Sequence, residues 1–118
     1  MTYYPYTNVP NVVFDYLPNL SYTELKVLLL IIRQTFGWMD KETRKQKQFD
    51  WISIRFFAKK TGLSKRAISD AIAKLIQKKL IIVKNEKGKI VHHKLQRRRA
   101  LKLYFSFNLE ATCAVISL

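Results

Sequence analysis

The alternation of apolar and polar residues is most regular between residues 52 and 83. After Ser64, a suitable N-cap, apolar side chains recur every three or four positions, which is the period of an amphipathic α-helix. A shorter helical segment comes before it, and Gly62 between the two is the residue type that lets a helix end in a left-handed turn. The β-branched run Ile81–Val83 predicts a strand directly after the second helix. The pattern therefore predicts a helix-turn-helix followed by a strand, as in winged helices.

The second predicted helix has one apolar and one polar face. The apolar face consists of Ile68, Ala71, Ile72, Leu75 and Ile76. The opposite face carries mostly basic and small side chains, which are Lys65, Arg66, Ser69, Asp70, Ala73, Lys74 and Gln77. Such a face is typical of a recognition helix that enters a DNA major groove. Because positive charge at a helix N-terminus opposes the macrodipole, Lys65 and Arg66 favour a binding role over an ordinary solvated surface.

Another long helix is predicted to begin after Ser21, which forms a capping box with Glu24, and to extend to Gly37. Its inward stripe is expected at Leu25, Leu28, Leu29, Ile32 and Phe36, widened by Val27, Leu30 and Ile31. A helix this apolar is expected to be nearly surrounded by protein. Residues 1–20 form an aromatic arm interrupted by prolines, and we expect it to pack on the core of its own chain or on a second subunit.

The segment after Val83 predicts two strands joined by a basic wing. Residues 85–88 are a turn signal, and residues 101–108 alternate apolar and polar side chains with the period of a half-buried strand. Arg97, Arg98 and Arg99 lie between them and are expected at the wing tip, on the sugar-phosphate backbone or in a minor groove, where arginine is favoured. Residues 39–48 are expected to form an exposed basic loop, either merely solvated or reaching a phosphate backbone. Residues 49–52 are expected to form a short strand.

Charge is concentrated in the region of the predicted helix-turn-helix. The 118 residues include 22 Lys and Arg against 8 Asp and Glu, a net charge of +14. Residues 1–40 hold two basic and three acidic residues, whereas residues 41–118 hold twenty and five. This distribution favours a polyanionic partner over a merely solubilising surface. The length and the hydrophobic fraction of 48% predict one folded unit, with an arm at 1–20, a DNA-binding domain at 21–110 and a tail at 111–118.

Several kinds of chemistry find no support in the sequence. Cys113 is the one cysteine, which excludes an intramolecular disulfide and an all-cysteine metal site and fits a reducing cytoplasm. His92 and His93 are adjacent and on a strand would point to opposite faces, so they would not readily share a metal. No glycine-rich phosphate loop is present, and no apolar run is long enough to cross a bilayer. We therefore expect a cytoplasmic binding protein rather than an enzyme, without metal or cofactor.

Two segments resemble a known family. They are TNVPNVVFDYLPNLSYTELKVLLLIIRQTFGW at residues 7–38 and ISIRFFAKKTGLSKRAISDAIAKLIQKKLIIV at residues 52–83, with FSFNLE at 105–110 more loosely similar. They resemble the N-terminal domain of phage lambda O-type replication initiators. The resemblance implies a winged helix that binds repeated sites in a replication origin, often as a dimer. It also implies that the replicative helicase or its loader is recruited through a separate C-terminal region, which we expect this chain to lack. Carried over position by position, the resemblance implies that five residues face the DNA groove, namely Ser64, Lys65, Arg66, Ser69 and Ala73.

We therefore expect a mainly α fold with a small β-hairpin, that is, a winged helix-turn-helix. We expect this fold to bind double-stranded DNA sequence-specifically. The expected role is replication initiation of a phage or mobile element. The residues expected to contact DNA are Lys59, Lys60, Ser64, Lys65, Arg66, Ser69, Ala73, Lys74, Arg97, Arg98 and Arg99. A winged-helix transcriptional regulator and a winged-helix protein-interaction module are the open alternatives. RNA binding is disfavoured, because Phe105 and Phe107 are expected to be buried rather than paired on an exposed sheet face.

Overall fold

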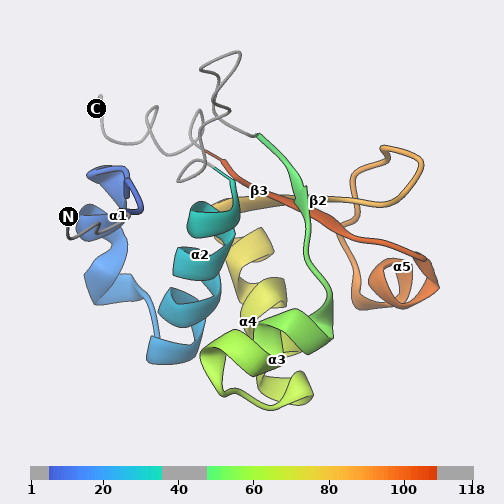
Figure 1. Cartoon of the computed structure of the whole chain (residues 1–118), viewed down its shortest axis with the longest axis horizontal. Coiled ribbons are helices and arrows are strands. Elements are labelled where there is room, and N and C mark those ends of the chain that lie inside the picture. The colour runs from blue at the N-terminus through green and yellow to red at the C-terminus, as the bar shows by residue number, and fades with distance from the viewer. Residues whose placement is uncertain (1–5, 36–47, 109–118) are drawn as a thin grey trace, which may run out of the picture.

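The computed structural model describes residues 6–35 and 48–108, in which helices pack against one face of a small sheet (Figure 1). The elements are α1 (Val12–Tyr16), a 3-10 turn (Leu17–Asn19), α2 (Tyr22–Gln34), β1 (Asp50–Trp51), α3 (Ile54–Thr61), α4 (Lys65–Gln77), β2 (Ile81–Lys84), α5 (Lys94–Arg99) and β3 (Tyr104–Phe107). The prediction of a mainly α fold with a small antiparallel β element is confirmed. The prediction that the helix after Ser21 extends to Gly37 is wrong, because α2 ends at Gln34 and the backbone of Thr35 leaves the helical conformation. Most of the basic loop expected at 39–48 and the tail at 111–118 lie outside the described residues. The domain boundaries stay a prediction.

α2 is the central helix of the core, as predicted. The hydroxyl of Ser21 accepts a hydrogen bond from the backbone N–H of Glu24 at 3.3 Å, so the predicted N-cap is present. The apolar residues that α2 buries are Val27, Leu28, Leu30, Ile31 and Ile32. Leu29 was expected on the inward stripe but is 39% exposed. The reason is that Leu28 and Ile31 lie on the side of α2 that faces the core, whereas Leu29 lies at the edge of that side.

α3 and α4 form the predicted helix-turn-helix pair, and each helix begins at a serine cap. The hydroxyls of Ser53 and Ser64 accept the backbone N–H groups of Phe56 and Ala67 at 3.1 Å each. Gly62 ends α3 with a φ of 74°, the left-handed conformation predicted for this glycine. α4 packs on α2 with Ile68, Ala71, Ile72 and Leu75, which are buried as expected.

The sheet is antiparallel with the strand order β1-β3-β2, so that β3 lies in the middle. In β3, Phe105 lies opposite Asp50 of β1 and Val83 of β2. Its buried ring meets the ring of Phe57 from α3 edge-on, with 5.2 Å between the centroids. Burial of Phe105 and Phe107 is therefore confirmed, and this face of the sheet closes the core.

The connection between β2 and β3 contains more than the predicted turn. The backbone N–H of Gly88 donates to the carbonyl of Asn85 at 3.0 Å, so the turn at residues 85–88 is present. The chain then forms α5. At the start of this helix, the side-chain oxygen of Gln96 accepts hydrogen bonds from the backbone N–H groups of His92 and His93, at 2.8 and 3.1 Å. Arg97–Arg99 lie in this helix and not at the tip of a hairpin. The winged assignment itself stays a prediction.

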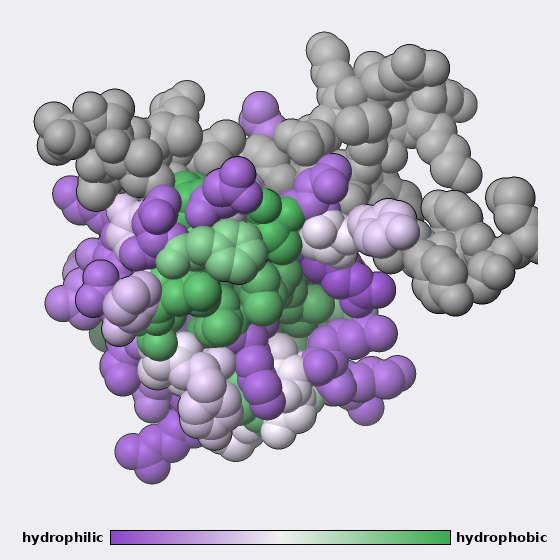
Figure 2. Space-filling view, turned by 90° about the vertical axis from the view of Figure 1, so that its left-hand side faces the viewer, coloured by the Kyte–Doolittle hydropathy of each residue, from purple (hydrophilic) through white to green (hydrophobic). Residues whose placement is uncertain are grey.

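Residues 6–20 contribute to the same core. Val12 and Val13 of α1 are buried together with the apolar residues of α2, so this part of the arm packs on its own chain. Phe14 and Leu17 point outward, with exposed fractions of 60% and 38%. Figure 2 shows a hydrophobic area on this side of the molecule, bordered by hydrophilic residues.

Candidate nucleic-acid interface

The polar face of α4 is exposed because its apolar face is fixed against α2. Lys65 and Arg66 occupy the first turn of the helix and are exposed, and Ala73 and Lys74 are exposed further along it. Ser64 is exposed as well, and its hydroxyl caps the helix. The structure therefore brings these predicted contacts to one exposed helix.

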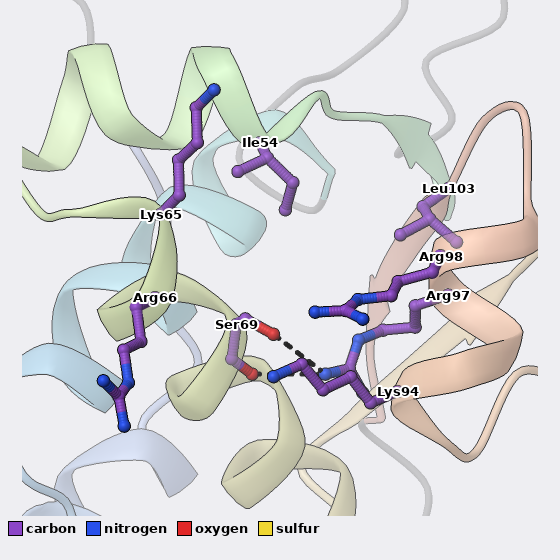
Figure 3. Close-up of a pocket in the computed structure, with 8 residues that line it drawn as sticks. All are labelled: Ile54, Lys65, Arg66, Ser69, Lys94, Arg97, Arg98 and Leu103. Carbon is purple, nitrogen blue, oxygen red and sulfur yellow. Dashed lines mark hydrogen bonds between the residues drawn. The ribbon is translucent and has the colours of Figure 1, made fainter.

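Ser69 differs from the other predicted contacts on α4, because it binds α5. Arg97 Nη2 lies 3.3 Å from the Ser69 carbonyl oxygen and 3.2 Å from Ser69 Oγ, and donates to both (Figure 3). Arg97 is only 9% exposed. The side chain that the sequence placed at a wing tip therefore connects α5 to the middle of α4.

The buried charge of Arg97 has partners on α4. Burial lowers the pKa of the Arg97 guanidinium, and the negative charge of Asp70 acts in the opposite direction. A buried cation requires hydrogen bonds or an opposite charge, because leaving it unpaired away from water is highly unfavourable. Ser69 supplies the hydrogen bonds and Asp70 the opposite charge, so neighbouring positions of α4 fix α5 in place.

A cleft of about 550 Å³ lies between α4 and α5. Its charged lining is entirely basic, and the lining residues are Ile54, Lys65, Arg66, Ser69, Lys94, Arg97, Arg98 and Leu103. Figure 3 shows the side chains of Lys94, Arg97 and Arg98 extending from α5 toward α4. Cations that face a common hollow from two sides create a positive potential that attracts an anion. The cleft is therefore suited to a phosphate group.

A family model described as bacteriophage replication protein O matches residues 5–95, which is more than half of the chain. The chain belongs to the bacteriophage replication protein O family. A search of curated proteins and a search of solved structures each found no match. Membership confirms the resemblance seen in the sequence and places the chain in phage DNA replication and its initiation.

The match to replication protein O covers one wall of the cleft and part of the other. It includes all of α4 and ends within α5, so Lys65, Arg66 and Lys94 lie inside it. Arg97 and Arg98 lie two and three residues beyond its end. The cleft is thus built partly from the family segment and partly from residues that follow it.

Six predicted contacts of this replication protein O family member do not line the cleft, and three of them, Lys59, Lys60 and Arg99, also lie outside the exposed surface of α4. Lys59 and Lys60 are exposed at the end of α3, where Lys60 Nζ lies 5.9 Å from the centroid of the Phe56 ring. Arg99 lies on α5 beside a separate hollow that is also lined by Glu86. These three residues remain basic surface positions around the site.

Sequence reasoning missed Lys94 as a member of the site. It precedes Arg97 and Arg98 by three and four positions, a spacing that gathers side chains on one side of a helix. The spacing is informative only if residues 94–99 form a helix, and these residues have no apolar period to indicate one.

The described residues offer neither a cluster of metal ligands nor a membrane-spanning helix. In residues 6–35 and 48–108, no group of three or more His, Cys, Asp or Glu side chains is placed to hold a metal ion. Over the same residues, no helix combines the length and apolar character needed to span a membrane.

Proposed function

We propose that this chain binds double-stranded DNA sequence-specifically, with α4 in the major groove, at sites in a phage replication origin. The observation that carries the proposal is the basic cleft beside the exposed first turns of α4. Phosphate contacts supply much of the affinity of DNA-binding proteins, whereas contacts to base edges supply specificity. The cleft fits the first role and the exposed face of α4 fits the second.

The predicted contacts divide between these roles. Arg66 is exposed in the first turn of α4 and has the fork geometry that donates two hydrogen bonds to guanine. Ala73 and Lys74 extend the same exposed helix surface toward further base pairs. The residues assigned to phosphates are Lys59, Lys60, Lys65, Lys94, Arg98 and Arg99. Ser64 caps the helix, and Ser69 with Arg97 holds the two walls together.

The first test is selection of bound duplexes from a random DNA pool at about 150 mM salt, which suppresses nonspecific electrostatic binding. We expect a defined motif to be enriched, and a motif that lies in a phage origin supports the origin-binding role. Enrichment of a motif found only at promoters would instead favour a transcriptional regulator. Failure to enrich any motif, with binding lost as salt rises, would contradict sequence-specific recognition and favour a protein-interaction module.

We further propose that the chain acts by binding alone, without catalysis or a cofactor, in the cytoplasm. A homodimer stays a prediction, as does recruitment of the replicative helicase or its loader through a separate C-terminal region. Sedimentation velocity with and without the selected duplex would determine the number of protein copies on one site.

A further inference from the structure

The sheet carries a row of side chains on the face opposite the core. The strand register places Trp51 of β1 beside Tyr104 of β3, and Tyr104 beside Lys84 of β2. The adjacent row contains Phe105 and Val83, which are buried in the core. Because successive side chains of a strand point to opposite faces, the Trp51 row lies on the outer face. Sequence reasoning found no aromatic pair on an exposed sheet face, and the register corrects that interpretation.

The row is accessible at one end of the sheet. Trp51 is 50% exposed although it is a large aromatic residue, and Tyr104 and Lys84 are partly exposed. Ser106, the next residue of β3 on this face, is 4% exposed. Tyr104 is therefore the more accessible of these two β3 residues on the outer face.

Two lysines lie over aromatic rings at this surface. Lys102 Nζ is 4.8 Å from the ring centroid of Trp51, and Lys84 Nζ is 4.2 Å from that of Phe49, which directly precedes β1. Such pairs place positive charge next to flat apolar faces. A lysine side chain is flexible, so its ammonium group can move to a phosphate and leave the ring open to a base.

Within residues 6–35 and 48–108, two carboxylates near this surface, those of Asp50 and Glu86, are held by hydrogen bonds. Asp50 belongs to the Phe105 row, and its carboxylate accepts a hydrogen bond from the Gln34 side chain at 3.4 Å. The Glu86 carboxylate accepts the backbone N–H of Leu101 at 3.1 Å and also bonds the backbone of Lys102, so it is held at the edge of this surface. Neither carboxylate belongs to the aromatic row, so the row combines flat rings with positive charge.

We infer that Phe49, Trp51 and Tyr104, together with Lys84 and Lys102, form a platform for single-stranded nucleic acid. Bases stack on exposed aromatic rings irrespective of sequence, and lysines hold the phosphates between them. A duplex does not fit this role, because its base faces are already stacked within the helix. The platform is built on the sheet, whereas the proposed duplex site is built on α4 and α5. The inference therefore goes beyond the proposed function and does not depend on it.

The test uses the full chain and a fluorescein-labelled dT12 oligonucleotide, with binding measured by anisotropy at about 100 mM salt. We expect Trp51→Ala to weaken binding between about 5-fold and about 150-fold, the range found for loss of one base–aromatic stack. Tyr22→Ala is the matched control, because Tyr22 is 69% exposed on α2 and has Lys26 Nζ at 5.4 Å from its ring. It should leave dT12 binding unchanged. An rU12 oligonucleotide distinguishes DNA from RNA as the preferred strand.

Three further measurements make the inference falsifiable even if one variant folds poorly. Trp51→Phe keeps a ring and should retain most of the affinity. In a Trp38→Phe background, binding of dT12 should quench the fluorescence of Trp51. An oligonucleotide of the same length with abasic sites should bind more weakly, because it has phosphates but no bases. Equal binding of the abasic strand, or unchanged dT12 affinity in a folded Trp51→Ala variant, would overturn the inference.

The duplex site and the platform are separated by crossed variants. Arg66→Ala should weaken binding to the selected duplex and leave dT12 binding unchanged. Trp51→Ala should show the opposite pattern. If Arg66→Ala weakened dT12 binding while Trp51→Ala did not, single strands would bind at the α4 cleft, and the platform would be refuted without affecting the duplex proposal.

Discussion

Arg97 is buried and donates hydrogen bonds to Ser69, so we expect a substitution of Arg97 to weaken DNA binding although Arg97 itself does not contact DNA. Arg97→Met keeps the apolar stem but removes the donors that lie 3.2 and 3.3 Å from the Ser69 oxygens. Hydrogen bonds to charged groups contribute about 1.5–3 kcal/mol each, but the substitution also removes the desolvation penalty of the guanidinium. We therefore expect a net loss of about 1–3 kcal/mol in the free energy of unfolding, measured by urea denaturation.

The same substitution should release α5 from α4 and displace two cations of the cleft. Each lost phosphate contact lowers the slope of log affinity against log salt by about 0.9. Arg98→Met removes one exposed cation and should lower the slope by about 0.9 at unchanged stability. Arg97→Met should lower it by about 1.8, because Lys94 and Arg98 both lose their position. Arg33→Met is the control, since Arg33 is an exposed arginine of α2 that does not line the cleft and is not assigned to DNA.

The measurement is anisotropy of a labelled duplex that contains the selected site, titrated at several salt concentrations. An unchanged slope for Arg97→Met would refute the reasoning that Arg97 positions the wall of the cleft. A reduction of about 0.9 with unchanged stability would instead show that Arg97 itself contacts a phosphate. Circular dichroism must show that the helices of each variant remain folded.

Three other predictions concern the recognition helix, the turn and a buried carboxylate. Arg66→Ala should weaken binding to the selected duplex by about 1–3 kcal/mol and leave random duplexes nearly unaffected, and equal losses would make Arg66 a phosphate contact. Gly62→Ala should lower the free energy of unfolding by about 1–2 kcal/mol, because a φ of 74° is strained for a residue with a Cβ atom. No atom lies within 4 Å of the added Cβ, so the loss comes from the backbone conformation and not from a clash. Gly62→Asn should lower the free energy of unfolding less. Burial alone would raise the pKa of Glu24, but hydrogen bonds from Lys78 and Ser21 hold that pKa below its ordinary value. Its contribution to stability is therefore present above pH about 4.5 and is lost as pH falls, so acid should destabilise the unaltered chain more than Glu24→Gln in urea melts.

The helix-turn-helix could be predicted from the sequence because its signals are local. Ser53, Gly62 and Ser64 mark the helix ends, and the apolar period of α4 fixes which side faces the core. These features depend on residues within a few positions of one another. The position of Gly62 in the turn and the buried face of α4 were therefore both anticipated correctly.

The second wall of the cleft could not be predicted in the same way. Residues 94–99 are mostly basic, and Leu95 is 65% exposed, so no apolar stripe reveals a helix. A run of three arginines is normally solvated, and burial of the first depends on the presence of Ser69 nearby in space. The Trp51 row was missed for a related reason, because it arises only when strands distant in the sequence are paired.

The position of β3 has a consequence for how the chain is synthesised. β1 comes before the two helices and β2 after them, yet each pairs with β3, whose residues are translated after both. On the ribosome, α3 and α4 are therefore complete while the strands on either side of them still lack their common partner. A shortened chain ending at residue 95, where the family match ends, would leave both strands with unpaired edges, which favour aggregation. The boundary of the family match is thus not the boundary of the folding unit.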